Sequence, residues 1–317
     1  MNIVITGSIA FDYLMTFPGR FLEHIKPEKL QKLSLSFLVD EMRRQRGGCA
    51  ANIAYNLGLL GEHPVLMGTA GQDFGDYREW LEDHGVDTSA VKTVPEVFTA
   101  SFFANTDMEQ NQIASFYSGA MAYARTLSFH DLETPVHLTI ISPNDPEAMI
   151  KYPLECKELG IPYIYDPSQQ IVRMEGALLR EGVEGADILI VNDYEFELLK
   201  ERTEMSEEEL RASVKRAVII TLGDEGCLVW ADEKIRVPAV PPERILDPTG
   251  VGDGFRAGLI KGLAMELPWK TAARIGSLAA TYVLETQGPQ THHYTPVEFA
   301  VRYEEVFGED AFVQAIL

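Results

Sequence analysis

Residues 247–253 read Asp-Pro-Thr-Gly-Val-Gly-Asp, and their types suit a reaction at a phosphoryl group. Gly250 and Gly252 lack a β-carbon, so the backbone around them can adopt unusual dihedrals and turn successive N–H groups toward one point. A helix that begins at Gly252 or Asp253 would add the positive end of its dipole. Four backbone amides would then form an anion hole, those of Gly250, Val251, Gly252 and Asp253.

Asp253 would lie beside the point at which negative charge develops during such a transfer. A carboxylate is useful there only as a general base that takes the proton from an attacking hydroxyl group. The alternative is a glycine turn whose aspartate caps the following helix, and this arrangement is common. The loop by itself leaves both interpretations open.

A second segment with possible chemistry runs from Arg46 to Gly61 and contains the pair Gly47-Gly48. Two glycines let the backbone approach a ligand closely, and Asn52 on the first turn of the following helix could hydrogen-bond a hydroxyl group. The alternative is a helix entry whose small residues permit close packing. For this segment taken alone, the alternative is the better interpretation.

Other phosphate-binding and kinase signatures are absent from the sequence. There is no Gly-x-x-x-x-Gly-Lys-Ser/Thr loop, no protein-kinase catalytic set and no dinucleotide-binding glycine spacing. Any phosphoryl transfer by this chain is therefore expected to differ from that of the P-loop enzymes.

The composition is that of an acidic globular protein. The 317 residues carry a formal net charge of -21, with 46% hydrophobic and 24% charged residues. A nucleic-acid-binding surface needs clustered basic residues, and no Lys/Arg run is longer than Arg43-Arg44. The 3 scattered cysteines match no zinc spacing and indicate a reducing cytosol, and no signal peptide or membrane-length apolar stretch is found. We therefore expect a cytoplasmic protein that binds neither nucleic acid nor membrane.

Short apolar runs rich in β-branched residues alternate with helix-like stretches along the chain. This alternation is typical of an α/β fold, here a three-layer α/β/α sandwich whose mostly parallel central sheet is covered on both faces. The expected strands are residues 3–5, 65–67, 138–141, 163–165, 188–191 and 218–221. The expected helices are residues 50–60, 74–84, 146–159, 193–202, 255–265, 269–284 and 296–307. Ser206 and Thr295 have capping-box spacing to a following glutamate.

Two regions break this alternation, residues 11–46 and 97–118. The first is aromatic near its start and β-prone over residues 33–39. The second alternates as strands do, and the polar turn at 105–108 between two β-prone runs predicts a hairpin. We expect both regions to be insertions that form a small β-sheet lid on a single domain spanning residues 1–317.

The two chemical segments, in this order and at this separation, resemble the paired signatures of the ribokinase-like, or PfkB, family. The resemblance extends over nearly the whole chain. Residues Asn192-Asp-Tyr-Glu195 are similar to the family's Asn-x-x-Glu motif, which helps to organise magnesium and phosphate. Residues Thr221-Leu-Gly223-Asp-Glu-Gly226 are similar to its Thr-x-Gly-x-x-Gly nucleotide loop.

Within the family, the chain most resembles the bacterial adenosine kinases. The similar stretches outside the catalytic signatures bear on the subgroup rather than on the fold, and they are residues 6–10, 17–21, 35–40, 113–121, 144–149 and 166–170. Gly254 and Ala51 depart from the subgroup's usual alanine and glycine, respectively. Neither departure removes a chemical group.

The resemblance implies a nucleoside bound beneath the lid. Asp12 follows the first strand, where the family keeps an aspartate that binds substrate hydroxyls, and Asn52 suits the same ribose. A purine is best held by aromatic side chains, which Phe102 and Phe116 would supply, although packing within the lid core is the alternative for them. The expected substrate-binding residues are Ser8, Asp12, Ser36, Gly48, Asn52, Phe102, Phe116 and Asp253.

The implied reaction is transfer of the γ-phosphoryl group of ATP to the 5′-hydroxyl of adenosine, giving AMP and ADP. Magnesium would be held through water near Asn192 and Glu195, so no residue is assigned as a direct metal ligand. Family members often carry K⁺ near Asp247 and Thr249. Many dimerise through the lid, and because the lid strands have an exposed edge to protect, we expect a homodimer.

Three alternatives to an adenosine kinase stay open from the sequence. The first is a PfkB-family kinase of ribose or fructose, for which an aromatic clamp would serve no purpose. The second is a kinase of another nucleoside. The third is a catalytically silent nucleoside-binding protein, which would have no need of a base at Asp253.

Overall fold

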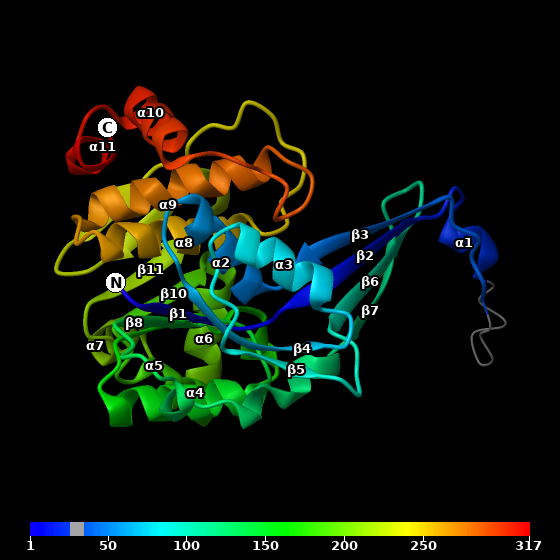
Figure 1. Ribbon diagram of the computed structural model, residues 1–317, viewed down its shortest axis with the longest axis horizontal. Helices are drawn as coiled ribbons and strands as arrows, with labels where there is room; N and C mark the ends of the chain where they lie inside the picture. Colours follow the sequence, from blue (N-terminus) through cyan, green and yellow to red (C-terminus); the bar gives the residue numbers. More distant parts are fainter. Residues whose placement is uncertain (26–34) are drawn as a thin grey trace.

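The computed structural model describes residues 1–25 and 35–317, and its strands form two separate sheets. The larger sheet has nine strands in the order β13-β12-β11-β10-β9-β8-β1-β4-β5 (Figure 1). All neighbours from β11 to β5 are parallel, whereas β12 and β13 are antiparallel additions at one edge. The mostly parallel central sheet expected from the sequence is therefore confirmed.

The central strands of the larger sheet are short and buried along their whole length. β1 and β8 consist only of Ile, Val, Leu and Thr, and every residue in them is buried. Such strands are continuous apolar runs because helices cover both faces of the sheet. The nine strands are β1 (Ile3–Thr6), β4 (Val65–Gly71), β5 (Val91–Val94), β8 (Leu138–Ile141), β9 (Tyr163–Tyr165), β10 (Ile188–Asn192), β11 (Ala217–Thr221), β12 (Cys227–Trp230) and β13 (Lys234–Val237).

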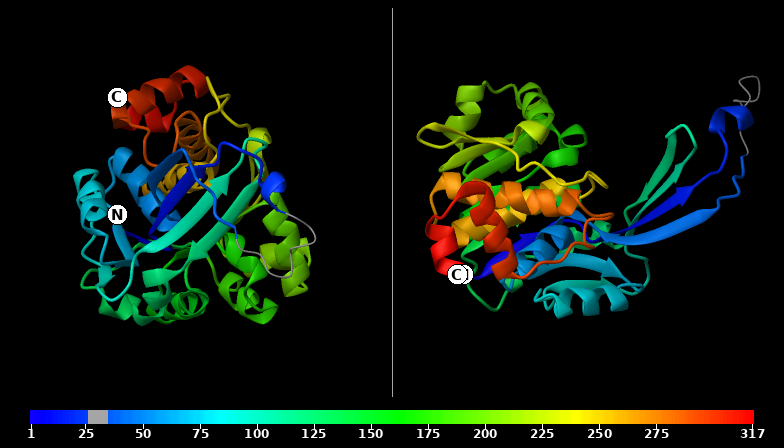
Figure 2. Two further views of the ribbon diagram at one scale, coloured as in Figure 1. Left: turned by 90° about the vertical axis from the view of Figure 1, so that its right-hand side faces the viewer. Right: turned by 90° about the horizontal axis from the view of Figure 1, so that it is seen from above.

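Helices on the two faces of the larger sheet enclose two hydrophobic cores, as Figures 1 and 2 show. One face carries α2 (Cys49–Leu59), α3 (Gly75–Asp83), α8 (Val251–Ala264), α9 (Trp269–Leu284), α10 (Pro296–Phe307) and α11 (Ala311–Ile316). The other face carries α4 (Pro146–Leu159), α5 (Gly176–Val183), α6 (Asp193–Thr203) and α7 (Glu207–Ser213). Short 3-10 helices are η2 (Gly119–Thr126), η3 (Phe129–Asp131), η4 (Ser168–Val172) and η5 (Gly223–Glu225).

The helix ends agree with the local signals in the sequence. The capping boxes expected at Ser206 and Thr295 are both formed, each with the glutamate three residues later. The helices α4, α9 and α10 have the bounds expected, whereas α8 begins at Val251, ahead of the expected residue 255. None of the described helices has the length and apolar character needed to cross a membrane.

The smaller sheet has four strands in the order β3-β2-β6-β7 and projects from one side of the molecule (Figures 1 and 2). Its strands are β2 (Ala10–Thr16), β3 (Glu41–Gly47), β6 (Ala100–Thr106) and β7 (Gln112–Tyr117), and the short helix α1 (Phe21–His24) follows β2. β6 and β7 pair in antiparallel register and form the hairpin predicted from the sequence. The small additional β-sheet is thus confirmed.

One strand of the smaller sheet forms near the end of the expected segment 11–46, and not at its β-prone run. Of the β-prone residues 33–39, only 35–39 are within the described part of the chain, and they form no strand. The strand is β3 instead, whose charged sequence lacks any apolar alternation. β3 pairs along its length with β2, so strand pairing overrides the weak local preference. The assignment of residues 1–317 to one domain with an inserted lid stays a prediction.

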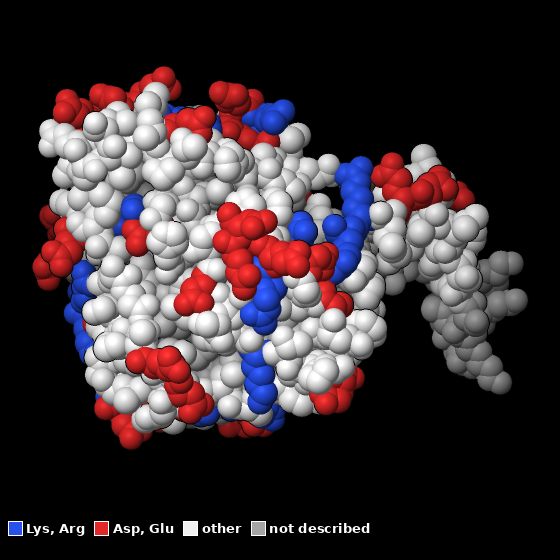
Figure 3. All heavy atoms as spheres, viewed as in Figure 1, with Lys and Arg blue, Asp and Glu red and all other residues white. Residues whose placement is uncertain are grey.

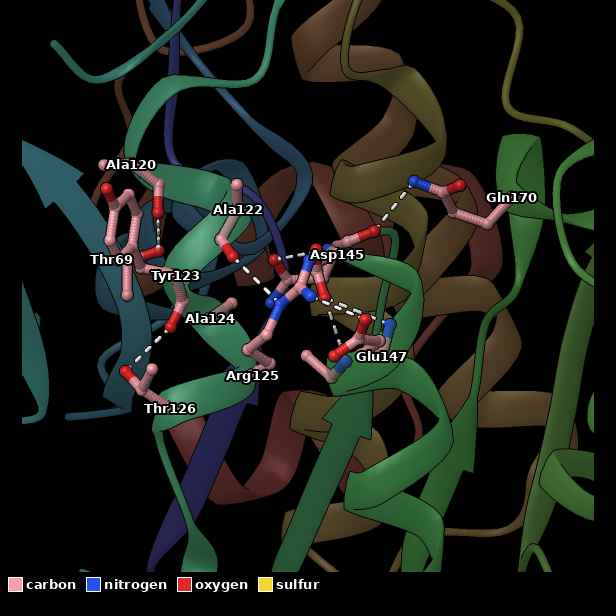
Figure 4. A network of polar contacts seen from close by, with 12 residues as sticks. Thr69, Ala120, Ala122, Tyr123, Ala124, Arg125, Thr126, Asp145, Glu147 and Gln170 are labelled. Atoms are coloured by element: carbon pink, nitrogen blue, oxygen red, sulfur yellow. Dashed lines mark hydrogen bonds and ion pairs between the residues drawn. The ribbon is translucent and has the colours of Figure 1, made fainter. Parts of the chain in front are cut away.

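The 3-10 helix η2 connects β7 of the smaller sheet to the body of the molecule. Near its start, the hydroxyl of Thr69 in β4 donates to the carbonyl of Ala120, with an oxygen–oxygen distance of 2.7 Å. Near its end, Arg125 reaches toward the start of α4 (Figure 4). The return segment of the smaller sheet is therefore fastened to both the larger sheet and α4.

Asp145, at the start of α4, forms an ion pair with Arg125 and also caps that helix. Arg125 Nη2 lies 2.7 Å from Asp145 Oδ2, and Arg125 forms a second ion pair with Glu147. The other oxygen of Asp145 accepts hydrogen bonds from the amides of Glu147 and Ala148. One buried carboxylate therefore serves both the helix end and the anchor of η2.

Replacement of Asp145 by alanine is predicted to lower the free energy of unfolding by about 1–2 kcal/mol, because the cap and the partner of Arg125 are lost together. Asp145→Asn, which can still accept the two amide bonds, should recover most of the loss. Glu147→Ala is the control, since its ion pair with Arg125 is exposed and contributes little. Urea unfolding measures all three. Equal stabilities of the Asp145→Ala and Glu147→Ala variants would contradict the role given to Asp145.

Candidate active site

A cavity of about 1320 Å³ opens at the carboxyl ends of the larger sheet's strands, beside the smaller sheet. Ligands of open α/β sheets bind at this edge, and the volume is sufficient for two small molecules. The expected site residues that line it are Ser8, Asp12, Gly48, Asn52, Phe102, Phe116, Asn192, Glu195, Thr221, Gly223, Gly226, Gly250, Val251, Gly252 and Asp253. Ser36 is the exception, because it is exposed and does not line the cavity.

The start of α8 is directed into the cavity by a sharp turn at Gly250. This residue has a φ of 81°, which glycine adopts without strain. A β-carbon here would lie 2.5 Å from the β-carbon of Pro289, so a side chain would also clash. Gly252 has no positive φ, so of the two glycines expected to need unusual dihedrals only Gly250 has one.

Three backbone amides at the start of α8 are available to a ligand. Those of Gly250, Gly252 and Asp253 pair with no acceptor in residues 1–25 and 35–317, as is usual at the start of a helix. The amide of Val251 is already engaged, with a nitrogen–oxygen distance of 3.3 Å to the carbonyl of Pro248. The predicted anion hole therefore keeps three of its four donors free.

A chain of hydrogen bonds fixes the carboxylate of Asp253 from the side of α2. Asn52 Nδ2 donates to Asp253 Oδ2 at 2.8 Å, and Asn52 Oδ1 accepts from Gln290 Nε2 at 2.9 Å. Gln290 also donates to the hydroxyl of Tyr77, which in turn donates to the carbonyl of Gly47 at 2.9 Å. Because both ends of the Asn52 amide are engaged, its orientation toward Asp253 is fixed.

The start of α2 approaches the end of β1 closely. Gly48 has a φ of 93°, and a β-carbon on it would lie 2.5 Å from the carbonyl oxygen of Ser8. The Ser8 hydroxyl oxygen accepts a hydrogen bond from the amide of Cys49 at 2.9 Å. The hydroxyl proton of Ser8 is left for another acceptor, so the packing and ligand-binding interpretations of this segment are compatible.

The smaller sheet presents a carboxylate and two aromatic rings in one row across its strands. Asp12 in β2 is in register with Phe102 in β6, which is in register with Phe116 in β7. Residues in register share one face of a sheet. Phe116 is 45% exposed, so it does not pack in a lid core, which was the alternative for it. Burial, with a smaller contribution from Asp247, raises the pKa of Asp12 to about 6.

Asn192 and Glu195 form a capping box at the start of α6. The Asn192 side chain accepts from the amide of Glu195 at 2.7 Å, and Glu195 Oε2 accepts from the amide of Asn192 at 2.9 Å. Glu195 Oε1 also accepts from the hydroxyl of Ser168 at 2.9 Å. Each carboxylate oxygen of Glu195 accepts one hydrogen bond and can accept another, and Glu195 lines the cavity.

The expected nucleotide loop lies beside this capping box. Thr221 at the end of β11 is in register with Asn192 at the end of β10. Gly223 and Gly226 both have positive φ, of 59° and 94°. A β-carbon on Gly226 would lie 2.1 Å from the carbonyl of Val237, so the loop requires glycine at that position.

Two charged residues of the cavity wall have no role in the sequence-based prediction, Arg256 and Asp166. Arg256 Nε and Nη2 each donate to one oxygen of Asp166, both at 2.6 Å. Ser142 donates to Asp166 as well, and both members of the ion pair are buried. Gln290 and Tyr77 were also missed, because nothing in the local sequence indicates that they meet Asn52.

Because the protein carries a net negative charge, an anionic ligand must be bound by individual groups within the cavity. Figure 3 shows separate clusters of acidic side chains on one face, with fewer basic side chains among them. Inside the cavity, burial raises the pKa of Asp253 to about 6, although Arg256 and the hydrogen bond from Asn52 act in the opposite direction. Asp253 is therefore ionised at neutral pH yet basic enough to accept a proton.

Comparison with known proteins agrees with this geometry. The family model described as pfkB family carbohydrate kinase matches residues 11–295. A nucleoside kinase of Methanothermobacter thermautotrophicus is 31% identical over 302 residues, covering 92% of each chain. The solved structure of Burkholderia thailandensis nucleoside kinase in complex with inosine is similar with a TM-score of 0.86 and 39% identity, covering 97% of this chain and 98% of that one. The nucleoside kinase of Methanocaldococcus jannaschii has a TM-score of 0.85 at 26% identity, covering 96% and 99%.

The fold and the cavity define a phosphotransferase that acts on a hydroxyl group, with a parallel sheet, a smaller sheet beside the cavity and a helix start directed at it. The chain belongs to the PfkB family of carbohydrate kinases. Kinases of this family use ATP, so the expected phosphoryl donor, ATP, is confirmed for the family to which the chain belongs.

Replacement of Gln290 by leucine is predicted to lower both stability and turnover. Asn52 Oδ1 is buried and would lose its donor, which is expected to reduce the free energy of unfolding by about 1–3 kcal/mol. Asn52 would also be free to rotate away from Asp253, so kcat should fall. Thr291→Val is the matched control, because the hydroxyl of the neighbouring Thr291 bonds only to backbone carbonyls and makes no hydrogen bond to Asn52. A Gln290→Leu variant as stable and active as the control would disprove the orienting role.

Proposed function

We propose that this chain is an ATP-dependent kinase of nucleosides that phosphorylates the 5′-hydroxyl of adenosine. The observation that carries the proposal is the row formed by Asp12, Phe102 and Phe116, which lines the same cavity as the Asp253 carboxylate and the start of α8. The relatives reported above are nucleoside kinases, and one of them binds inosine, which is also a purine nucleoside.

The acceptor site combines groups that suit both parts of a nucleoside. The ribose has vicinal hydroxyl groups, for which the Asp12 carboxylate is an acceptor and the second N–H of Asn52 is a donor. The Ser8 hydroxyl and the backbone at Gly48 line the same part of the cavity. The purine has a flat apolar face, and the two phenylalanine rings of the smaller sheet match it.

Asp253 is the proposed general base. It takes the proton of the 5′-hydroxyl while the oxygen attacks the γ-phosphorus of ATP, and the bond from that phosphorus to the bridging oxygen of ADP breaks. The free amides of Gly250, Gly252 and Asp253, at the positive end of α8, would stabilise the charge on the transferred phosphoryl group. Closure of the smaller sheet over the substrate would exclude water, which otherwise competes as acceptor.

The nucleotide is proposed to lie along Thr221, Gly223 and Gly226, with its phosphates toward α8. No group of three or more metal-binding side chains gathers in the described ranges 1–25 and 35–317, so magnesium would depend on phosphate oxygens, water and the spare capacity of Glu195. Bound there, the ion would neutralise charge on the β- and γ-phosphates. A K⁺ site near Asp247 and Thr249 stays a prediction.

A homodimer joined through the smaller sheet is also part of this proposal. β7 is an edge strand of that sheet, and all its residues are exposed. Ile113 and Phe116 are each 45% exposed, and Tyr117 is 43% exposed. A strand edge with apolar side chains of this kind favours pairing with a second copy.

Two experiments separate adenosine kinase from its alternatives. The first measures ADP release with adenosine, inosine, guanosine, ribose and fructose as acceptors. The highest kcat/KM is expected with adenosine, and the free sugars should be poor acceptors because they leave the phenylalanines unused. A preference for another nucleoside would replace the assigned substrate, preference for a sugar would overturn the nucleoside assignment, and no response to any acceptor would indicate a binding protein.

The second experiment tests the base. Asp253→Asn is predicted to reduce kcat by about 10²–10⁴-fold, since the base is removed. Adenosine affinity, measured by calorimetry, should change little. The melting temperature should not fall, because the variant removes a partly buried charge and its amide oxygen can still accept from Asn52. A kcat close to that of the wild type would disprove the assignment of Asp253 as the general base.

A further inference from the structure

We propose that Arg256 is a further catalytic residue, whose free Nη1 group donates a hydrogen bond to the transferring phosphoryl group. The inference rests on the proposed function, because it concerns the same cavity and the same reaction. It assigns a role to a side chain that follows Asp253 by one helical turn and lines the cavity.

The guanidinium of Arg256 is held by only part of its donor set. Nε and Nη2 bind the two oxygens of Asp166 at 2.6 Å each, and this bidentate contact fixes the plane of the group. Nη1 pairs with no acceptor in the described residues, and no ion pair joins Arg256 to Asp253. Arg256 is 8% exposed, so this unpaired donor belongs to a side chain that is more than nine-tenths buried.

The position of Gly252 shows which way Nη1 points. A β-carbon on Gly252 would lie 2.7 Å from Arg256 Nη1, closer than real β-carbons approach another atom. Because Gly252 does not need a positive φ, the missing side chain is explained by the space that the guanidinium takes. Nη1 therefore lies against the first turn of α8, over the α-carbon of Gly252.

This arrangement places a fixed positive charge beside the anion hole. Asp166 is immobilised by Ser142 and by burial, so the guanidinium cannot swing away. Burial opposes the charge of Arg256, but the neighbouring Asp166 carboxylate raises its pKa above the ordinary arginine value, so the group stays protonated. Preorganised donors of this kind act on charge that develops in the transition state.

The chemical step stays balanced with Arg256 in this role. The 5′-oxygen forms its bond to the γ-phosphorus, the bond to the bridging oxygen of ADP breaks with its electron pair, and the hydroxyl proton goes to Asp253. Arg256 neither gains nor loses a proton. It stabilises the equatorial oxygens of the phosphoryl group during the transfer, which is a known use of arginine in phosphoryl transfer.

The competing interpretation is a purely structural ion pair between α8 and the loop after β9. A second buried ion pair on α8 supplies the matched control. Lys261 Nζ lies 2.6 Å from Glu62 Oε1, Lys261 is 7% exposed, and neither residue lines the cavity. Removal of either ion pair should change the free energy of unfolding by a similar amount. A larger loss of kcat on removal of the Arg256 pair would therefore reflect a role at the phosphoryl group.

The test uses the full-length enzyme with three variants: Arg256→Lys, the double variant Arg256→Gln/Asp166→Asn, and the control double variant Lys261→Gln/Glu62→Gln. The neutral pair in the second variant avoids an unpaired buried carboxylate. Both Arg256 variants are expected to lose roughly 10²–10³-fold in kcat with adenosine affinity unchanged, while the control keeps its kcat. If the double variant fails to fold, the Arg256→Lys variant alone tests the inference. The single ammonium group of lysine cannot bind Asp166 and a phosphoryl group at the same time.

A transition-state mimic provides a second readout. Adenosine, MgADP and aluminium fluoride together should raise the melting temperature of the wild type and of the control beyond the effect of adenosine and MgADP alone. The Arg256 variants should lose this increment. If the Arg256 variants have the same kcat and the same increase in melting temperature as the control variant, the inference is overturned, whichever acceptor is used. If the wild type prefers another acceptor, only the assigned substrate fails and the assay is run with that acceptor. If it phosphorylates none, both proposals fail.

Discussion

The amide of Asn52 donates to the carboxylate of Asp253 across 2.8 Å, and this contact joins the starts of α2 and α8. Both helices begin at glycines with positive φ, Gly48 and Gly250, so both enter the cavity after a sharp turn. The carboxylate lies where a helix dipole favours negative charge, while burial disfavours it, and the Asn52 bond helps to hold the charge. The other residues of the cavity are arranged around this carboxylate, with the proposed hydroxyl-binding groups on the smaller sheet and the proposed phosphate-binding groups on the larger.

The large parallel sheet gives the site its rigidity. Its strands end together at the cavity, so residues far apart in the sequence, such as Ser8, Asn192 and Thr221, are carried to one edge by buried apolar strands. The smaller sheet contributes the remaining groups on a separate support that is fastened through η2. A rigid larger sheet and a separate smaller sheet beside the cavity suit a kinase, which must enclose two substrates and then release the products.

Much of this architecture could be predicted from the sequence because it depends on local signals. Continuous apolar runs mark the buried strands, and the capping boxes at Ser206 and Thr295 mark helix starts. What could not be predicted depends on pairing across the fold. β3 is a strand because β2 lies beside it, and Ser36 does not reach the cavity. The contacts of Gln290 with Asn52, and of Arg256 with Asp166, join residues distant in the sequence, so no local pattern reports them.

The pH dependence of kcat/KM for adenosine tests the role of Asp253 most directly, because this constant reports the protonation state of the free enzyme. The pKa values of Asp253 and Asp12 are each raised to about 6, and both groups are expected to act as carboxylates. We predict a constant value above about pH 7.5 and a fall below about pH 6 that exceeds tenfold per pH unit, since two groups are protonated. A value that stays constant down to about pH 5 would contradict the assignment of Asp253 as the base.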